Sequence, residues 1–381
     1  GVGIEAVCGE NLVCGKCRVK IMEGEFPKED ITSSLSHVGK VDEKEMKTLK
    51  KKEKQENIRL ACSTSIMGDI LVFVPEASRT GKQIVSKAAG KIKVKLKPAV
   101  KKYYVVLLPP SLENPHGDFE RLCDVLAKAH GLKKVSIDYR ALQVLPDVLR
   151  TGDWKVTVTV WQDHEIIRVE SGRVETNVGL AVDVGTTTVA GYLTDLNTGE
   201  VLATESMMNP QVSYGEDVMS RITYCMLNEE DGLKELQETM VEGLNTIAKN
   251  AAKRVDLTPE DISEMTIVGN TAMHHILLGI NPEYIGLAPL APALPNSMDI
   301  KAERFGIRIL PSGNIHILPI EAGFVGADNV GCLIADTPHK RKKITLLIDI
   351  GTNGELILGN KDKLISCSCA TGPALEGAQI E

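Results

Sequence analysis

The chain has 381 residues, of which 43% are hydrophobic and 25% are charged, an ordinary composition for soluble globular domains. Its formal net charge of −7 and its low aromatic content of 4% argue against a nucleic-acid partner. Nucleic-acid binders usually carry basic surfaces and stack aromatic side chains on bases.

No apolar run approaches the roughly 18 residues of a spanning helix, so no membrane partner is expected. We see no secretion signal ahead of the nine cysteines. That combination favours a reducing, cytoplasmic location, where clustered cysteines serve metal or redox chemistry more often than disulfides.

Shifts in composition divide the chain into four predicted domains or segments. A cysteine cluster and a highly charged stretch fill residues 1–76, and a Lys-, Ala- and Gly-rich linker follows over 77–100. A small α/β middle domain is predicted over 101–175, and the largest domain over 176–381.

The N-terminal cysteines carry the first chemical signal. Cys8, Cys14 and Cys17 have the spacing C-x5-C-x2-C, and "RLACST" supplies Cys62 far along the chain. Three close ligands and one distant ligand resemble a ferredoxin loop that holds a [2Fe–2S] cluster. A zinc site or incidental thiols are the alternatives, but zinc sites usually present two paired knuckles. We expect Cys123, Cys225 and Cys332, which sit in apolar helical patterns, to be core residues.

The middle segment predicts a strand at 103–108, a helix at 118–131 that stops at a glycine, and a hairpin over 154–170. The third domain predicts strands at 179–185, 187–196 and 199–207 and helices near 215–228 and 231–254. A further strand starts at 264, and Asn270 is expected to cap the helix that follows it.

An internal repeat dominates the third domain. Residues 181–193 align with residues 347–359 at a constant offset of 166, and each copy is a strand, then Asp-x-Gly-Thr, then a strand. Such a repeat suggests two related halves that face each other across a cleft. A tight Gly-Thr turn offers backbone N–H groups to an anion, and the aspartate would bind a divalent cation that bridges phosphate oxygens. The expected phosphate-binding residues are Asp183, Gly185, Thr186, Thr187 and Thr188 in the first loop and Asp349, Gly351, Thr352, Asn353 and Gly354 in the second.

The paired loops resemble those of the actin-like, ribonuclease H-like ATPase superfamily. This resemblance implies ATP and Mg²⁺ as ligands and a connecting helix within 318–336, with Glu321 at its start and Asp328 in its middle. Asp183 and Glu321 are the expected catalytic residues. Asp217 and Arg221 have i, i+4 spacing, and we favour a surface ion pair between them.

A β-grasp ferredoxin-like domain, a linker, a small α/β domain and an actin-like domain in this order resemble the reductive activators of corrinoid proteins. The resemblance implies an ATP-dependent enzyme that takes an electron from a low-potential donor through the cluster. The enzyme would return that electron to the inactive Co(II) corrinoid of a methyl-transfer protein and so restore Co(I). We expect the first ferredoxin hairpin and the adenosine-binding segment to lie outside this chain. A homodimer is compatible with the sequence, which does not decide the oligomeric state.

Two other functions share these motifs. A small-molecule kinase with a redox-sensing cluster would use the same phosphate loops, and it would need a substrate pocket with a carboxylate base. A non-enzymatic electron-transfer module would use the nucleotide only to regulate assembly.

Overall fold

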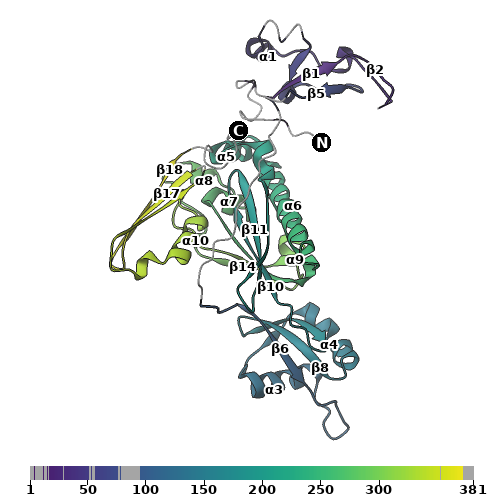
Figure 1. Cartoon of the computed structure of the whole chain (residues 1–381), viewed down its shortest axis with the longest axis vertical. Coiled ribbons are helices and arrows are strands. Elements are labelled where there is room, and N and C mark those ends of the chain that lie inside the picture. The colour runs from purple at the N-terminus through teal and green to yellow at the C-terminus, as the bar shows by residue number, and fades with distance from the viewer. Residues whose placement is uncertain are drawn as a thin grey trace.

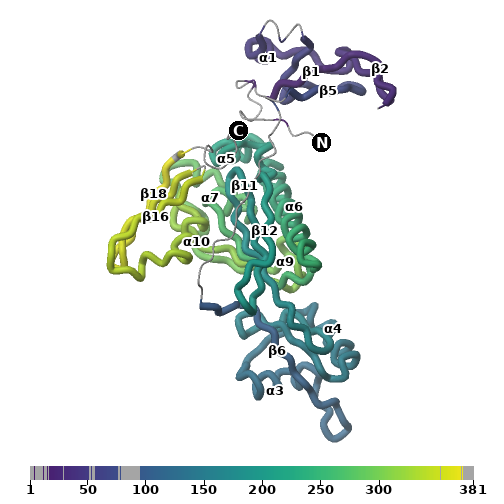
Figure 2. The backbone as a smooth tube through the Cα atoms, viewed as in Figure 1, coloured from purple at the N-terminus to yellow at the C-terminus, as the bar shows by residue number. Residues whose placement is uncertain are grey.

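The computed structural model describes residues 4, 12, 15, 17–28, 30–50, 53, 56–75, 78, 95–351 and 353–371. Figure 1 shows several units, and Figure 2 follows the chain from the purple N-terminal unit to the yellow C-terminal sheet. The fold is a multidomain mixture of helices and sheets, as the sequence predicts. Within the described residues, every helix is too short or too polar to cross a membrane.

The N-terminal unit (residues 17–75) is built around a three-stranded antiparallel sheet in the order β4-β1-β5. Val19 and Ile21 alternate with exposed or half-buried neighbours along the central strand, so one face of the sheet packs into a small core with Val38. Its elements are β1 (Arg18–Met22), β2 (Gly24–Phe26), β3 (Ile31–Ser33), η1 (Leu35–His37), α1 (Glu43–Thr48), β4 (Ile58–Leu60), η2 (Ala61–Ser63) and β5 (Leu71–Phe73).

The four-stranded unit (residues 100–172) has the sheet order β6-β8-β9-β7, with α3 and α4 supplying apolar side chains to its core. The predicted hairpin forms, and its turn at Gln162 and Asp163 has positive φ at both residues. The predicted helix ends at Gly131, whose φ of 74° is the left-handed cap that favours glycine. The elements are β6 (Val100–Val106), α3 (Asp118–His130), β7 (Ser136–Ile137), α4 (Tyr139–Thr151), β8 (Lys155–Trp161) and β9 (Glu165–Ser171).

The six-stranded unit (residues 178–341) has the sheet order β12-β11-β10-β13-β15-β14. β10, β13 and β15 run parallel, and β10 is apolar and buried along most of its length, as central parallel strands usually are. One face packs against α5, α6 and α7 in the main core, and α10 packs against β13. The strands are β10 (Val178–Val184), β11 (Thr188–Asp195), β12 (Val201–Met208), β13 (Ile262–Gly269), β14 (Met298–Lys301) and β15 (Asn314–Ile317).

The helices of this unit include the two predicted near 215–228 and 231–254 and the one that Asn270 was expected to cap. Asn270 accepts a hydrogen bond from the Met273 amide, 3.0 Å away, so the predicted cap is confirmed. The helices are η4 (Pro210–Tyr214), α5 (Val218–Leu227), α6 (Gly232–Lys253), η5 (Pro259–Asp261), α7 (Thr271–Leu277), α8 (Glu283–Gly286), α9 (Ala302–Phe305), α10 (Ala327–Asp336) and η6 (Pro338–Lys340).

A three-stranded antiparallel sheet follows, in the order β16-β17-β18, and Figure 1 shows it beside α10. Leu346, Ile348 and Ile350 alternate along its first strand and are each more than half exposed. The strands are β16 (Thr345–Ile350), β17 (Asn353–Gly359) and β18 (Leu364–Ala370).

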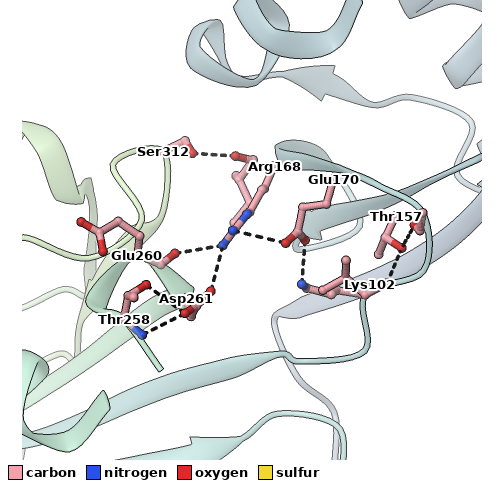
Figure 3. A network of polar contacts seen from close by, with 11 residues as sticks. Lys102, Thr157, Arg168, Glu170, Thr258, Glu260, Asp261 and Ser312 are labelled. Carbon is pink, nitrogen blue, oxygen red and sulfur yellow. Dashed lines mark hydrogen bonds and ion pairs between the residues drawn. The ribbon is translucent and has the colours of Figure 1, made fainter. Parts of the chain in front are cut away.

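The four-stranded unit is fixed to the six-stranded unit by apolar and polar contacts together. Arg168 donates to the Glu260 carbonyl at 2.9 Å and lies 3.8 Å from the Asp261 carboxylate (Figure 3). The Ser312 hydroxyl donates to the Ile167 carbonyl at 2.6 Å, and Ile167 packs in a small apolar cluster with Val100 and Leu310. These contacts join the four-stranded unit directly to the six-stranded unit, which carries the first of the loops described next.

Candidate nucleotide site and redox site

The first Asp-x-Gly-Thr loop joins β10 to β11 at one end of the parallel strands. Asp183 lies at the end of β10, and the Gly185 amide donates to the Thr188 carbonyl at 3.0 Å, which closes a tight turn. A Cβ atom at Gly185 would lie 2.6 Å from that same carbonyl oxygen. Glycine is therefore required here by the close approach of backbone to backbone.

Three successive carbonyls of this loop are held from the protein interior. Asn209 binds two of them, since its side-chain amide donates to the Gly185 carbonyl at 2.7 Å and its backbone amide to the Thr187 carbonyl at 2.8 Å. Arg221 donates to the Thr186 carbonyl between them. In a trans peptide the next N–H points opposite to the carbonyl, so the amides of residues 186–188 point away from these partners. Successive amides aimed to one side are the arrangement that binds anions.

The loop side chains are also held in place. The Thr186 hydroxyl accepts a hydrogen bond from the Asn270 side-chain amide at 2.8 Å. Asn270 caps α7, and a Cβ at Gly326, just before α10, would lie 2.4 Å from the Asn270 Cα atom. The start of α10 therefore packs tightly against the start of α7, and glycine at position 326 allows this close approach.

The second loop joins β16 to β17 in the same strand–turn–strand arrangement. The Gly351 amide donates to the Asn353 carbonyl at 2.9 Å, and the Thr371 hydroxyl donates to the Gly351 carbonyl at 2.6 Å. Asp349 lies at the end of β16, as Asp183 lies at the end of β10. Thr352, the residue that matches Thr186, lies outside the described residues.

Carboxylates from both loops act on one buried group, Asp328. Burial, with smaller contributions from the negative charges of Glu355, Asp183 and Asp349, raises the pKa of Asp328 to about 7. The two loops are thus close enough to influence the same side chain electrostatically. Burial also raises the pKa of Glu355, with a smaller contribution from Asp349.

This donor set fits a magnesium ion that is bound mainly by phosphate. Mg²⁺ usually takes one or two carboxylates and completes its shell with water and substrate phosphates. In the described residues, no group of three or more His, Cys, Asp or Glu side chains could hold a metal ion unaided. The repulsion from Glu355, Asp183 and Asp349, which adds to the effect of burial on the Asp328 pKa, is the kind that a divalent cation would relieve.

Two predicted placements need correction. Asp328 lies in the first turn of α10 rather than in the middle of the helix. Glu321 lies in the preceding loop, outside the helix, where its carboxylate accepts hydrogen bonds from Asn329 at 2.9 Å and from the Ser366 hydroxyl. The helix begins later than its sequence pattern indicates, because Gly323 and Gly326 lie in the loop that brings the chain against α7.

The predicted surface ion pair between Asp217 and Arg221 is wrong. Asp217 is the N-cap of α5, with an extended backbone, and its carboxylate accepts from the amide and hydroxyl of Ser220, both at 2.7 Å. Arg221 is completely buried instead. The i, i+4 rule applies to two residues inside a helix, whereas a capping side chain turns back over the helix end.

Three residues that support the site were not predicted from the sequence. Asn209 and Arg221 hold the first loop from behind, and the Cys332 thiol lies 3.5 Å from the Asp349 carboxylate. Cys332 is half-buried rather than a full core residue; Cys123 is also half-buried, whereas Cys225 is buried as expected. Burial and the charge of Asp349 raise the pKa of the Cys332 thiol to about 12.

The predicted cluster ligands lie partly within the described residues. The sulfurs of Cys17 and Cys62 are 3.2 Å apart, although the two residues are 45 positions apart in sequence. Two thiolates on one tetrahedral ion, with metal–sulfur bonds of about 2.3 Å, lie within about 4 Å of each other. The two sulfurs therefore meet at one place, as two ligands of one metal atom must, although they lie closer than the roughly 3.8 Å of a tetrahedral pair. Cys8 and Cys14 lie outside the described residues.

A buried ion pair fixes the chain segment that leads to Cys62. Glu45 is fully buried and binds the Arg59 guanidinium with both oxygens, at 2.9 and 3.0 Å. The same carboxylate accepts from the Leu60 amide at 2.7 Å. These bonds order β4 two residues before Cys62.

Three family models match successive parts of this chain. Models of the RACo linker region, the RACo middle region and the C-terminal ASKHA domain of RACo match residues 89–176, 178–341 and 343–381. The corrinoid activation enzyme RamQ of Eubacterium limosum is 31% identical over 382 residues, a match that covers 100% of this chain and 58% of RamQ.

Two further proteins extend the comparison. A solved structure of a reductive activator for corrinoid, iron–sulfur protein superposes with a TM-score of 0.70 at 33% identity, covering 100% of this chain and 60% of that one. A [Co(II) methylated amine-specific corrinoid protein] reductase of Methanosarcina barkeri is 25% identical over 213 residues, covering 53% of this chain and 38% of the reductase. The chain thus spans less than two thirds of the length of these relatives. With three RACo regions in succession over residues 89–381 and an actin-like ASKHA region among them, the chain belongs to the RACo family.

Proposed function

We propose that this chain serves an ATP-dependent reductive activator, which returns one electron to the inactive Co(II) corrinoid of a methyl-transfer protein and restores Co(I). The observation that carries the proposal is the 31% identity to a corrinoid activation enzyme along the whole chain. The geometry supports it at two places, the sulfur pair of the N-terminal unit and the paired loops of the actin-like part.

Cys8, Cys14, Cys17 and Cys62 would hold a [2Fe–2S] cluster. Such a cluster, when bound, accepts and releases one electron at a time at low potential. Cys17 is buried and Cys62 is half-buried in a small apolar cluster with Leu49 and Leu60, which limits the access of water to this side of the site. A low-potential donor would supply the electron.

The paired loops would bind ATP with Mg²⁺. The amides of residues 186–188 would face one phosphate group, and Asp183 and Asp349 would approach the cation from the two halves. Reduction of Co(II) by a donor of higher potential is uphill by about 2.3 kcal/mol for every 100 mV. Nucleotide binding can offset such a gap if the two halves close on the nucleotide and change how the corrinoid protein is bound.

The test is an anaerobic reaction of the full-length cytoplasmic protein, reduced by a low-potential donor, with a Co(II) corrinoid protein and ATP. We expect Co(I) absorbance to appear with ATP and to stay absent without it. Cys62→Ser should abolish the reaction, and Cys123→Ser should not, because Cys123 lies on α3 of the four-stranded unit, well away in sequence from the predicted ligands. No Co(I) with any corrinoid partner tried, or full activity of C62S, would contradict the proposal.

A further inference from the structure

Arg221 is a completely buried arginine directly behind the first phosphate loop. It lies on α5, and its guanidinium donates to the Thr186 carbonyl, to the Gly215 carbonyl at 2.9 Å and to the Gln211 side-chain oxygen at 3.3 Å. It also contacts the Met273 sulfur at 3.0 Å. The partners thus come from the loop itself, from η4 with its C-cap Gly215, and from α7.

None of these partners carries a negative charge. Among the residues that the structure describes, no carboxylate lies within ion-pair distance of Arg221. Asp217 acts on it only through space, because its carboxylate is bound to Ser220. Burial, partly offset by the charge of Asp217, lowers the pKa of Arg221 to about 9, so the side chain stays protonated at neutral pH.

A buried cation without a carboxylate partner is costly to the fold unless something else uses the charge. Here the guanidinium of Arg221 lies on the inner side of the first phosphate loop, and the backbone amides of residues 186–188 point to the opposite, outer side. An anion bound to those amides would therefore meet both the amide dipoles and the positive charge behind them.

We propose that Arg221 is a positioning residue for nucleotide binding, which holds the Thr186 carbonyl inward and supplies the positive charge that a bound phosphate neutralises. This inference rests on the proposed function of the loop as an ATP site. It adds a residue outside the Asp-x-Gly-Thr repeat, with a role that is electrostatic as well as structural.

The test compares Arg221→Met and Arg221→Lys with the wild type, all in the full-length protein, by calorimetric titration with Mg-ATP and Mg-ADP. Arg121→Met is the matched control, because Arg121 is also buried and donates only to carbonyls, those of His116, Leu108 and Asn114 in the four-stranded unit. We expect R221M to weaken ATP binding by about 10- to 100-fold, the usual effect of losing hydrogen bonds to a charged group. R121M should leave it within about twofold.

The charge on the ligand separates an electrostatic role from a merely structural one. R221M should weaken ATP binding about three- to tenfold more than ADP binding, because ATP carries one more negative charge. R221K keeps the cation and should keep the wild-type ratio of ATP to ADP affinity, even where its overall affinity falls. It also serves as the folded variant if R221M does not fold, and a changed ratio in R221K would then overturn the inference.

Two outcomes separate the inference from the function on which it rests. If the wild-type protein binds neither nucleotide, the proposed function and the inference fail together. If the wild-type protein binds ATP and R221M binds it equally well, or loses ATP and ADP affinity in equal proportion, the inference fails and the proposed function stands.

Discussion

Each of the two candidate sites is supported by a buried arginine. Arg59 forms an ion pair with a carboxylate, whereas the hydrogen-bond partners of Arg221 are neutral. Arg59 in the N-terminal unit is 5% exposed and pairs with both oxygens of the fully buried Glu45. Arg221 behind the first phosphate loop is also buried, and its hydrogen-bond partners are neutral. The charge of Arg59 is therefore neutralised by its neighbour Glu45, whereas the charge of Arg221 is not neutralised by any of its hydrogen-bond partners.

The paired charge orders a chain segment, and the unpaired charge remains available to a ligand. Although burial raises the pKa of Glu45, the hydrogen bonds from Arg59 and the Leu60 amide lower it by more, so the pair stays ionised and neutral overall. A neutral pair adds little field at the nearby sulfurs of Cys17 and Cys62. A lone buried cation projects its field into the loop beside it.

The largest effect should come from breaking the paired arginine. Glu45→Ala leaves the Arg59 charge buried without a carboxylate, and we expect the N-terminal unit to lose about 3–5 kcal/mol of stability. Hydrogen exchange of the β1 and β4 amides in the intact chain measures this loss locally. Exchange in the four-stranded and six-stranded units should not change.

The matched control for this prediction is Glu303→Ala. Glu303 forms an exposed pair with Arg140, at 2.5 Å, between the four-stranded unit and α9. Exposed pairs contribute at most about 1 kcal/mol. Equal effects of E45A and E303A would mean that burial of an ion pair does not decide how much it contributes to stability, and the paired Arg59 would no longer differ from Arg221 in the way proposed.

The local parts of both sites could be predicted from sequence. Strand, turn and strand around Asp183 and Asp349 follow from apolar runs interrupted by Asp-x-Gly-Thr, and the cap at Asn270 follows from its place before an apolar helix. The ferredoxin-like pattern of the cysteines, together with "RLACST", predicts Cys62 as the fourth cluster ligand, and in the structure the sulfurs of Cys17 and Cys62 are 3.2 Å apart.

The supporting residues could not be predicted, because tertiary packing decides their roles. The i, i+4 spacing of Asp217 and Arg221 is the same whether the helix face meets water or the protein interior. Only the packing of η4, α5 and α7 buries the guanidinium beside Thr186. Likewise, nothing in the run of charges around Glu45 distinguishes the one carboxylate that Arg59 binds.

A second, smaller effect should appear with acid at His274, a neighbour of Met273 on α7. His274 is 3% exposed, and its ring nitrogens have no hydrogen-bond partner among the described residues. Burial, and then the charge of His275, lower the pKa of His274 to about 4. His274 thus avoids the problem of an unpaired buried charge by staying neutral, which Arg221 cannot do at neutral pH.

The sign of the pH effect follows from this lowered pKa. Between about pH 6.5 and 4 the unfolded chain binds a proton at His274 that the folded chain does not, so stability falls as the pH falls through this window. We expect a loss of about 2 kcal/mol between pH 7 and pH 5 from this group. Denaturant unfolding of His274→Leu at both pH values should show a smaller loss than the wild-type protein shows. An unchanged loss would mean that other groups govern the acid sensitivity.

The smallest effect should come from Asp217, the acidic residue that acts on Arg221 through space. Asp217→Ala removes the cap of α5, and we expect the six-stranded unit to lose about 1 kcal/mol of stability in denaturant unfolding. Asp217→Asn keeps a capping oxygen and should lose less. Neither change should weaken ATP binding, because the carbonyl partners of Arg221 remain and the removal of a negative charge favours the anion. A loss of ATP affinity in D217N as large as that in R221M would identify Asp217 as the true counter-ion of Arg221. The contrast between a paired and an unpaired buried arginine would then disappear.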